Sequence, residues 1–150
     1  MKILVINGPS LNMLGIREKD IYGSKSYGDL VEYVNTEAQK LGVETEFRQS
    51  NHEGDLIDWL QDAYFEQYDG VVINPGGYTH TSVALADAIA AIAPLPVAEV
   101  HISDIDARED FRRSSFCAPQ CIAQIKGLGF EGYVKAIVEI MIYHSSCAPE

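Results

Sequence analysis

Two residues near the end of one apolar segment could form an acid–base pair. Glu99 and His101 are two positions apart in a segment whose apolar residues predict a strand, so their side chains should point to the same face. A carboxylate beside an imidazole can fix the tautomer of the ring and hold its proton ready for donation. The same two residues could instead form a purely structural hydrogen bond. Their place at the carboxyl end of a predicted strand favours chemistry.

A second candidate pair lies in a long connection near the N-terminus. Residues 8–28 carry Arg17 and Tyr22 between glycines that suit a lid closing over a substrate. A tyrosine has a reference pKa of about 10, so it needs help to act as a base at neutral pH. A guanidinium close by would supply that help by favouring the phenolate. The alternative is a solvated loop in which neither residue has a role.

The segment NPGGYTHTS, residues 74–82, adds further polar groups. His80 precedes a helix that Thr81 or Ser82 should cap, so we expect it near the positive end of the helix dipole. That position suits a neutral, hydrogen-bonding imidazole. His80 shares its loop with Asn74 and two glycines that let the backbone approach a ligand closely. A lone histidine is more often structural, so the residue types alone leave both interpretations open.

Five short segments predict the strands that must position these groups. Most are apolar runs of the kind buried on both faces of a parallel sheet, and one alternates apolar and polar residues. In chain order they are residues 3–6, 43–48, 71–73, 97–100 and 122–125. Stretches of helical period cover residues 27–41, 55–68, 81–93 and 131–144.

This β-α alternation predicts an open, doubly wound α/β sheet with helices on both faces. Because the chain has room for only five strands, we expect a flavodoxin-like parallel sheet of order 2-1-3-4-5 and not a dinucleotide-binding fold. In such a sheet the ligand site lies outside the carboxyl ends of the strands, near the switch point between the first and third. The polar residues follow the first, third and fourth predicted strands, where that site should form.

The composition is that of one globular domain. The chain has 150 residues, 47% hydrophobic and 22% charged, so we expect a single catalytic domain over residues 1–150. Its formal net charge of -11 repels phosphate backbones and anionic lipids, which argues against nucleic-acid and membrane partners.

The cysteines and the N-terminus indicate a cellular compartment. Three cysteines without a CxxC pair predict reduced thiols rather than a disulfide frame or a zinc site. Met1 leads almost directly into the first apolar run, which is far too short for a signal peptide or membrane span. We therefore expect a cytoplasmic protein.

Two surface features predict binding roles. The helix predicted over residues 81–93 holds one charge, Asp87, and its nearly continuous apolar character favours a subunit interface as its cover. Asp87 would then meet a cationic or hydroxyl partner across that interface, unless it simply faces solvent. Arg108, Arg112 and Arg113 form a cationic patch that could collect an anionic or hydroxylated substrate, or could be ordinary surface charges.

Taken together, these segments resemble the type II dehydroquinases from Lys2 to the final helix. The resemblance rests on GPSLNMLGIRE (8–18), IYG (21–23), NPGGYTHTS (74–82), EVHIS (99–103) and AREDFR (107–112), in the family's order and separations. It implies a dehydratase that removes water from 3-dehydroquinate to give 3-dehydroshikimate by anti elimination through an enolate. It also implies trimers that assemble into dodecamers. The reaction serves both aromatic biosynthesis and quinate catabolism, and the resemblance does not choose between them.

The resemblance also implies a role for each matching residue. Tyr22 would be the base, Arg17 its activator and His101 the acid, with Glu99 orienting His101. Asn12 would help hold a water that stabilises the enolate. Substrate contacts would come from Asn74, His80, Ile102, Ser103, Arg112 and Asp87, the last supplied by a neighbouring subunit. The chemistry needs no metal or organic cofactor, and the sequence offers no dedicated site for one.

The chain departs from the family at two positions. The family usually has asparagine where this chain has Ser10 and Asp104. A changed turn at Ser10 could shift Asn12 or the lid. Asp104 places a negative charge beside a site meant for a carboxylate unless its side chain turns outward.

Other proteins of this fold class make different demands on the sequence. A phosphate-accepting receiver domain needs acidic residues after the first and third strands, where this chain has Asn7 and Asn74. A phosphate-binding loop is absent because GPSLNMLG lacks the Gly-Lys-Ser/Thr ending. A flavin-binding electron carrier fits an acidic five-stranded domain and stays an alternative on fold alone.

Overall fold

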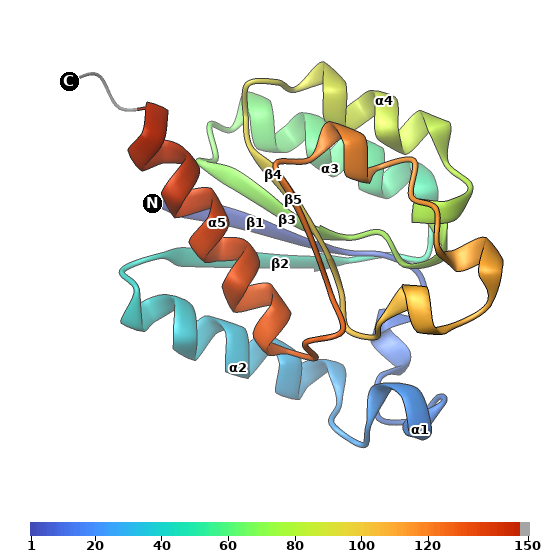
Figure 1. The fold of residues 1–150 in the computed structure, drawn as a ribbon. Coiled ribbons are helices and arrows are strands. Elements are labelled where there is room, and N and C mark those ends of the chain that lie inside the picture. The colour runs from blue at the N-terminus through green and yellow to red at the C-terminus, as the bar shows by residue number, and fades with distance from the viewer. Residues whose placement is uncertain (148–150) are drawn as a thin grey trace.

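Five parallel strands form one sheet in the order β2-β1-β3-β4-β5, as predicted (Figure 1). The structure is a computed structural model that describes residues 1–147. Its strands are β1 (Lys2–Asn7), β2 (Glu44–Gln49), β3 (Gly70–Asn74), β4 (Val97–His101) and β5 (Ala123–Lys126). Each observed strand lies within one residue of its predicted bounds. Strands β3 and β4 are buried throughout, whereas the edge strand β2 is half-buried, which explains its alternating sequence.

Two pairs of helices cover the two faces of the sheet. Helices α2 (Tyr27–Lys40) and α5 (Glu131–Cys147) pack on one face, and α3 (Glu53–Phe65) and α4 (Val83–Ala91) pack on the other (Figure 1). Alternate residues of β1 serve the two layers: Ile3 and Val5 join the core under α2 and α5, whereas Leu4 and Ile6 join the core under α3 and α4. This period-two burial makes the sheet a three-layer α/β sandwich.

Side-chain caps fix where two of these helices begin. Ser26 accepts a hydrogen bond from the Asp29 amide at 3.1 Å while the Asp29 carboxylate accepts from the Ser26 amide at 2.8 Å, which is a capping box. Ser82 accepts from the Leu85 amide at 2.9 Å and starts α4. The prediction of a cap at Thr81 or Ser82 is therefore confirmed at Ser82.

The apolar character of α4 has two origins. Leu85, Ala86, Ala88 and Ile89 are buried in the chain's own core, so part of the helix needs no partner. The opposite side is exposed and consists of Val83, Ala84, Asp87, Ala90 and Ala91. This small apolar surface with one carboxylate is the part of α4 that the chain's own core leaves uncovered.

The long connection of residues 8–28 contains ordered structure that the sequence did not predict. It holds a 3-10 turn at Leu11–Met13 and the four-residue helix α1 (Lys19–Tyr22), which lies beyond the carboxyl ends of the strands (Figure 1). Further short 3-10 turns lie at Gly76–His80, Ile105–Ala107, Asp110–Arg112 and Ala118–Gln120. Four of these turns contribute residues to the candidate site, namely Leu11, Gly76, Gly77, His80, Ile105 and Arg112.

The ends of β1 and β3 meet so closely that glycine is required. Asn7 and Asn74 are register partners, and the Gly8 amide donates to the Asn74 carbonyl at 2.8 Å. A Cβ on Gly8 would lie 2.7 Å from the Pro75 carbonyl oxygen, so a larger residue would separate the two strand ends. Gly76, at φ 59°, occupies the left-handed region that glycine adopts without strain.

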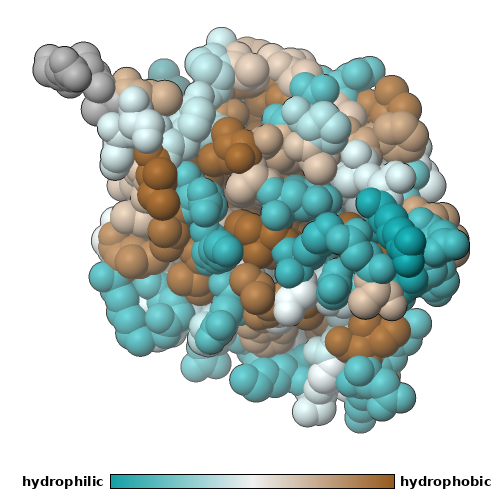
Figure 2. Space-filling model, viewed as in Figure 1, coloured by the Kyte–Doolittle hydropathy of each residue, from teal (hydrophilic) through white to brown (hydrophobic). Residues whose placement is uncertain are grey.

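The molecular surface is mixed. On the face of Figure 2, hydrophilic side chains gather over the segment that carries the 3-10 turns at 105–107 and 110–112, and apolar groups appear along α5. Within residues 1–147, none of the helices has both the length and the apolar character needed to cross a membrane.

Candidate active site

A pocket opens at the carboxyl ends of β1, β3 and β4, where the fold class places its ligands. It collects predicted site residues that lie up to 95 positions apart, from Arg17 to Arg112. The predicted residues that line it are Arg17, Tyr22, Asn74, His80, His101, Ile102, Ser103 and Arg112. With Arg108 it contains three guanidiniums, which suits an anionic ligand in a chain that is otherwise acidic.

Two guanidiniums contact the hydroxyl of Tyr22. Arg108 Nη1 donates to Tyr22 Oη at 2.8 Å, and Arg17 Nη2 donates to the same oxygen at 3.5 Å. Arg17 also lies over the Tyr22 ring, with its Cζ 4.6 Å from the ring centroid. The Tyr22 hydroxyl therefore accepts from two guanidinium groups that come from different loops.

Glu18 holds both arginines near Tyr22. Its carboxylate accepts from Arg17 at 2.6 Å and lies 4.0 Å from Arg108. The hydrogen bond from Arg17, together with the positive charges nearby, lowers the pKa of Glu18 below its usual value. The anion therefore persists in mildly acidic solution and keeps the two guanidiniums at this side of the pocket.

His101 and Glu99 form the predicted imidazole–carboxylate pair at the end of β4. His101 Nε2 lies 3.1 Å from Glu99 Oε1, and both side chains are buried. An ionised carboxylate only accepts hydrogen bonds, so the Nε2 atom carries a proton. The Nδ1 atom makes no hydrogen bond to any described residue and is the ring nitrogen left for a ligand.

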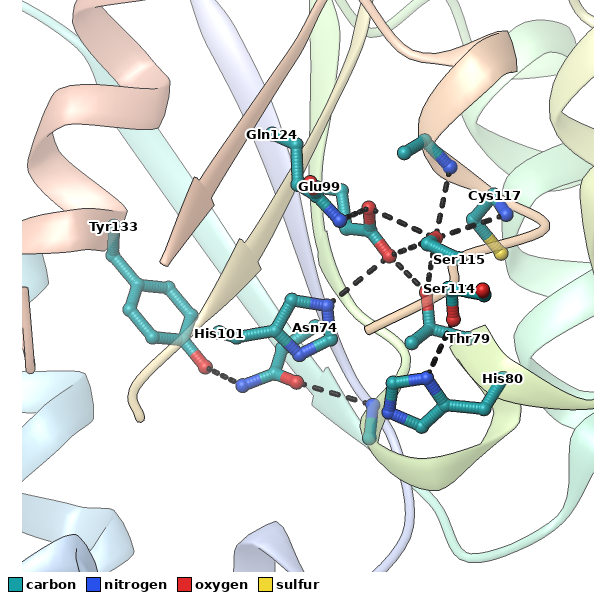
Figure 3. A network of polar contacts seen from close by, with 12 residues as sticks. Asn74, Thr79, His80, Glu99, His101, Ser114, Ser115, Cys117, Gln124 and Tyr133 are labelled. Atoms are coloured by element: carbon teal, nitrogen blue, oxygen red, sulfur yellow. Dashed lines mark hydrogen bonds and ion pairs between the residues drawn. The ribbon is translucent and has the colours of Figure 1, made fainter. Parts of the chain in front are cut away.

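Glu99 is held as an anion although it is fully buried. Burial alone would raise the pKa of Glu99, but hydrogen bonds from His101, Thr79 and Ser115 and the charge of His101 bring the pKa below its usual value. Gln124 Nε2 adds a further donor at 2.9 Å (Figure 3). A buried carboxylate with this many donors is a fixed negative charge behind His101.

His80 lies beside His101 with its tautomer also defined. Its Nδ1 lies 2.7 Å from the carbonyl oxygen of Ser114, which can only accept, so Nδ1 carries the proton in the neutral ring (Figure 3). The two imidazole rings stack at an interplanar angle of 20°, with centroids 6.4 Å apart. The prediction of a hydrogen-bonded His80 next to the capped helix agrees with this arrangement.

Asn74 is fixed by a buried polar chain. Its Nδ2 donates to Tyr133 Oη at 2.9 Å, and Tyr133 in turn donates to Asn7 Oδ1 at 2.6 Å. Asn74 Oδ1 accepts from the Gly76 amide at 3.1 Å, so both ends of the carboxamide have an assigned partner (Figure 3). Burial raises the pKa of Tyr133, which keeps this tyrosine neutral and able to donate. One N–H of Asn74 remains available to the pocket.

Three predicted site residues do not line the pocket of their own chain. Glu99 lies directly behind His101. Asn12 is exposed on the 3-10 turn at Leu11–Met13, where its Oδ1 accepts from Gln49 Nε2 at 3.5 Å. Asp87 is exposed on α4 and could reach a pocket only in a second copy of the chain.

The structure shows the local setting of both departures from the family pattern. Ser10 adopts a left-handed conformation at φ 68°, which asparagine tolerates better than serine, and its amide donates to Asn51 Oδ1 at 3.0 Å. Asp104 is exposed and accepts from the Asp106 amide at 3.0 Å, so it starts a 3-10 turn instead of facing the pocket. Its charge is therefore directed away from the pocket.

Several residues in contact with the site were not predicted. Arg108 was considered only as part of a surface patch, and Tyr133 and Ser115 were not considered at all. Arg113, the third arginine of that patch, is exposed, pairs with Asp110 at 3.5 Å and lies outside the lining. Across residues 1–147, no group of three or more His, Cys, Asp or Glu side chains is arranged to hold a metal ion.

The fold and the pocket together define a class of protein: a flavodoxin-like α/β protein with a polar pocket at its topological switch point. Residues 1–141 match the family model described as "Dehydroquinase class II". The chain is a member of this family.

Individual relatives agree with this assignment. A 3-dehydroquinate dehydratase of Fusobacterium nucleatum is 54% identical over 147 residues, 97% of this chain and 99% of that protein. One of Caldicellulosiruptor bescii is 57% identical over 136 residues, 91% of this chain and 93% of that protein. The crystal structure of type II dehydroquinase from Butyrivibrio crossotus, 52% identical, superposes with a TM-score of 0.92 over 94% of this chain and 97% of that one.

Proposed function

We propose that this chain converts 3-dehydroquinate to 3-dehydroshikimate, with Tyr22 as the base and His101 as the acid. Membership of the dehydroquinase class II family makes it a dehydratase, and therefore a hydro-lyase. The observation that carries the proposed mechanism is the pairing of Arg108 and Arg17 with the Tyr22 hydroxyl in the pocket that also contains His101.

The first step is removal of a proton next to the substrate ketone. The phenolate of Tyr22, favoured by its two guanidinium partners, takes this proton, and the C–H electron pair becomes the enolate. A water held by Asn12 stabilises the enolate oxygen in this proposal. Because Asn12 lies outside the pocket lining, the loop that carries it must approach when substrate binds.

The second step is loss of the β-hydroxyl group. Protonated His101 donates its Nδ1 proton to the leaving oxygen while the enolate electrons form the carbon–carbon double bond, and water departs. Glu99 stabilises the imidazolium and keeps the ring in one orientation. Base and acid then exchange protons with solvent, which returns Tyr22 and His101 to their starting forms.

The substrate carboxylate and hydroxyls need fixed partners. Arg112, whose Nε donates to Glu109 at 2.7 Å, and the free N–H of Asn74 are donors on the pocket wall. His80, Ile102 and Ser103 complete the contacts in this proposal, and Asp87 reaches the substrate from a neighbouring subunit. We propose trimers, assembled into dodecamers, in which the exposed side of α4 faces the next subunit and residues 1–150 act as one catalytic domain.

An absorbance assay tests the proposed function. Incubation of the purified protein with 3-dehydroquinate should produce the ultraviolet absorbance of a conjugated enone. The Tyr22→Phe protein, prepared in the same way, is the matched control for contaminating activity and should give no gain. A folded wild-type protein without an absorbance gain would overturn the proposal.

A further inference from the structure

Ser115 binds Glu99 from outside the sheet. Its Oγ lies 2.9 Å from Glu99 Oε1 and 3.2 Å from Oε2, so one hydroxyl spans both carboxylate oxygens (Figure 3). Ser115 belongs to the loop between the 3-10 turns at 110–112 and 118–120, whereas Glu99 belongs to β4. The site residues predicted from the sequence do not include Ser115.

The local backbone fixes the direction of the Ser115 hydroxyl. The amides of Cys117 and Ala118 donate to Ser115 Oγ at 3.2 and 3.0 Å and occupy its lone pairs. Its single proton is then directed at Glu99 or at Thr79 Oγ1, 2.7 Å away, and the Thr79 hydroxyl itself contacts Glu99 Oε1. In either arrangement the Thr79 hydroxyl donates to Oε1, the oxygen that His101 contacts, and Ser115 holds Thr79 or Glu99 in place.

The titratable groups around Glu99 do not compete for this carboxylate. They are His101 on β4 and the thiols of Cys117 and Cys121, which lie close enough for their charges to interact with that of Glu99. Burial and the negative charge of Glu99 raise the pKa of Cys117 to about 12 and also raise that of Cys121. Both thiols are therefore neutral at physiological pH and do not compete with His101 for Glu99.

The same loop also holds the second imidazole. The Ser114 carbonyl accepts from His80 Nδ1 at 2.7 Å, and the Phe116 amide donates to the Thr79 carbonyl at 2.8 Å. Residues 114–116 thus contact the His80 turn through the main chain and the Glu99–His101 pair through one side chain. The two functions can be separated by substitution, because only Ser115 acts through its side chain.

We propose that Ser115 is a positioning residue for the acid His101 and acts through Glu99. This inference rests on the proposed function, in which His101 protonates the leaving hydroxyl. Without the Ser115 hydroxyl, Glu99 loses the one donor that spans both of its oxygens, but it keeps Thr79, Gln124 and His101 as partners. The carboxylate is then held less firmly, and so is the acceptor that keeps His101 Nδ1 aimed into the pocket. Substrate contacts stay in place because neither Ser115 nor Glu99 lines the pocket.

Steady-state kinetics of Ser115→Ala test the proposal. We expect kcat to fall about 10- to 100-fold, the effect of one lost hydrogen bond to a charged group, and KM to stay within about twofold. Exchange of the substrate's acidic C–H proton with solvent deuterium should persist while dehydration slows, because the base is intact. Ser115→Thr keeps the hydroxyl and should retain most activity. Gln120→Ala, an exposed change in the turn that Ser115 caps, should behave like wild type.

A double-mutant cycle separates action through Glu99 from loss of the turn cap. In a Glu99→Gln background, Ser115→Ala should cause little further loss of kcat. If Ser115 acted only through the turn, it would lower kcat by the same factor in both backgrounds. Thermal unfolding of each variant identifies any that fail to fold. Wild-type kcat in Ser115→Ala, equal loss of exchange and dehydration, or full additivity would overturn the proposal. An inactive wild-type protein would instead overturn the proposed function.

Discussion

Arg108 Nη1 donates to the hydroxyl of Tyr22 at 2.8 Å, although the two residues are 86 positions apart in the chain. Arg17, only five positions from Tyr22, is farther from the same oxygen, at 3.5 Å. The guanidinium distant in sequence is therefore the nearer one in space. It joins the loop after β1 to the loop after β4 across the mouth of the pocket.

The first prediction concerns the base. Tyr22→Phe removes one oxygen and little volume from a half-buried side chain, so folding and substrate affinity should change little. Turnover should fall by at least about 100-fold, because a general base contributes roughly 10²- to 10⁴-fold. Enone absorbance gives the rate, and tritium or deuterium exchange at the substrate carbon gives the proton-transfer step. Retention of a near-normal rate would show that another group is the base.

The second prediction compares the two arginines. Arg108→Gln should lower kcat at least as much as Arg17→Gln, by about 10- to 100-fold, since it removes the shorter hydrogen bond to the phenolate. In both variants the activity maximum should move to higher pH, because the phenolate has lost part of its electrostatic support. Arg113→Gln changes the same residue type in the same segment but outside the pocket, and is the control. Identical pH profiles for all three variants and the wild type would contradict this role.

The third prediction separates the two proton transfers. His101→Ala should block loss of the hydroxyl more than removal of the carbon-bound proton, since Tyr22 and its arginines are unchanged. Solvent deuterium should still enter the substrate after dehydration has stopped. Proton NMR of the recovered substrate measures the exchange. Simultaneous loss of exchange and dehydration in a folded protein would mean that Tyr22 and His101 do not divide the work in this way.

Some of these contacts were predictable from the sequence, because strand spacing and sheet order determine them. Others were not. Glu99 and His101 share a strand, so their spacing alone places them on one face. The sheet order brings Asn7 and Asn74 together because parallel neighbours end at the same edge. The burial pattern of β1 and β3 was equally visible as short apolar runs.

The contacts that the sequence did not predict come from loops and from a helix that covers the sheet. Tyr133 reaches Asn7 from α5, 126 positions away, and nothing in its helical period distinguishes it from a core aromatic residue. Ser115 and Arg108 lie on a segment of short 3-10 turns without a repeating pattern. Helix α1 has only four residues, and its N-cap Glu18 is in a left-handed conformation, so tertiary contacts stabilise it more than its own sequence does.

The fourth prediction follows from the lowered pKa of Glu99. Because the folded pKa lies below the ordinary value of 4.5, ionised Glu99 stabilises the fold above pH 4.5 and loses this contribution as pH falls through the folded value. Glu99→Gln has no such titration and cannot accept from all four donors. The difference in Tm between the two proteins should be largest near pH 7 and shrink below pH 4.5. Circular dichroism melts across this range measure it, and a difference independent of pH would contradict the assignment.

The last prediction concerns Asp87, which is exposed on α4 and outside its own pocket. If it binds substrate in a neighbouring subunit, Asp87→Ala should raise KM by about 2- to 10-fold, the effect of one hydrogen bond, with a smaller change in kcat. Ala90→Glu, on the same exposed side of α4, should disrupt the proposed assembly, and light scattering measures the change in mass.

Mixing two variants identifies which subunit supplies Asp87. Tyr22→Phe subunits have no base but keep Asp87, whereas Asp87→Ala subunits keep Tyr22. When the two are unfolded and reassembled together, an active site with Tyr22 from one subunit and Asp87 from its neighbour should form, and KM should return to the wild-type value in that fraction of sites. Co-refolding Asp87→Ala with itself is the control and should keep the raised KM. A fully active monomer, or a mixed assembly whose KM stays raised, would mean that each subunit builds its site alone.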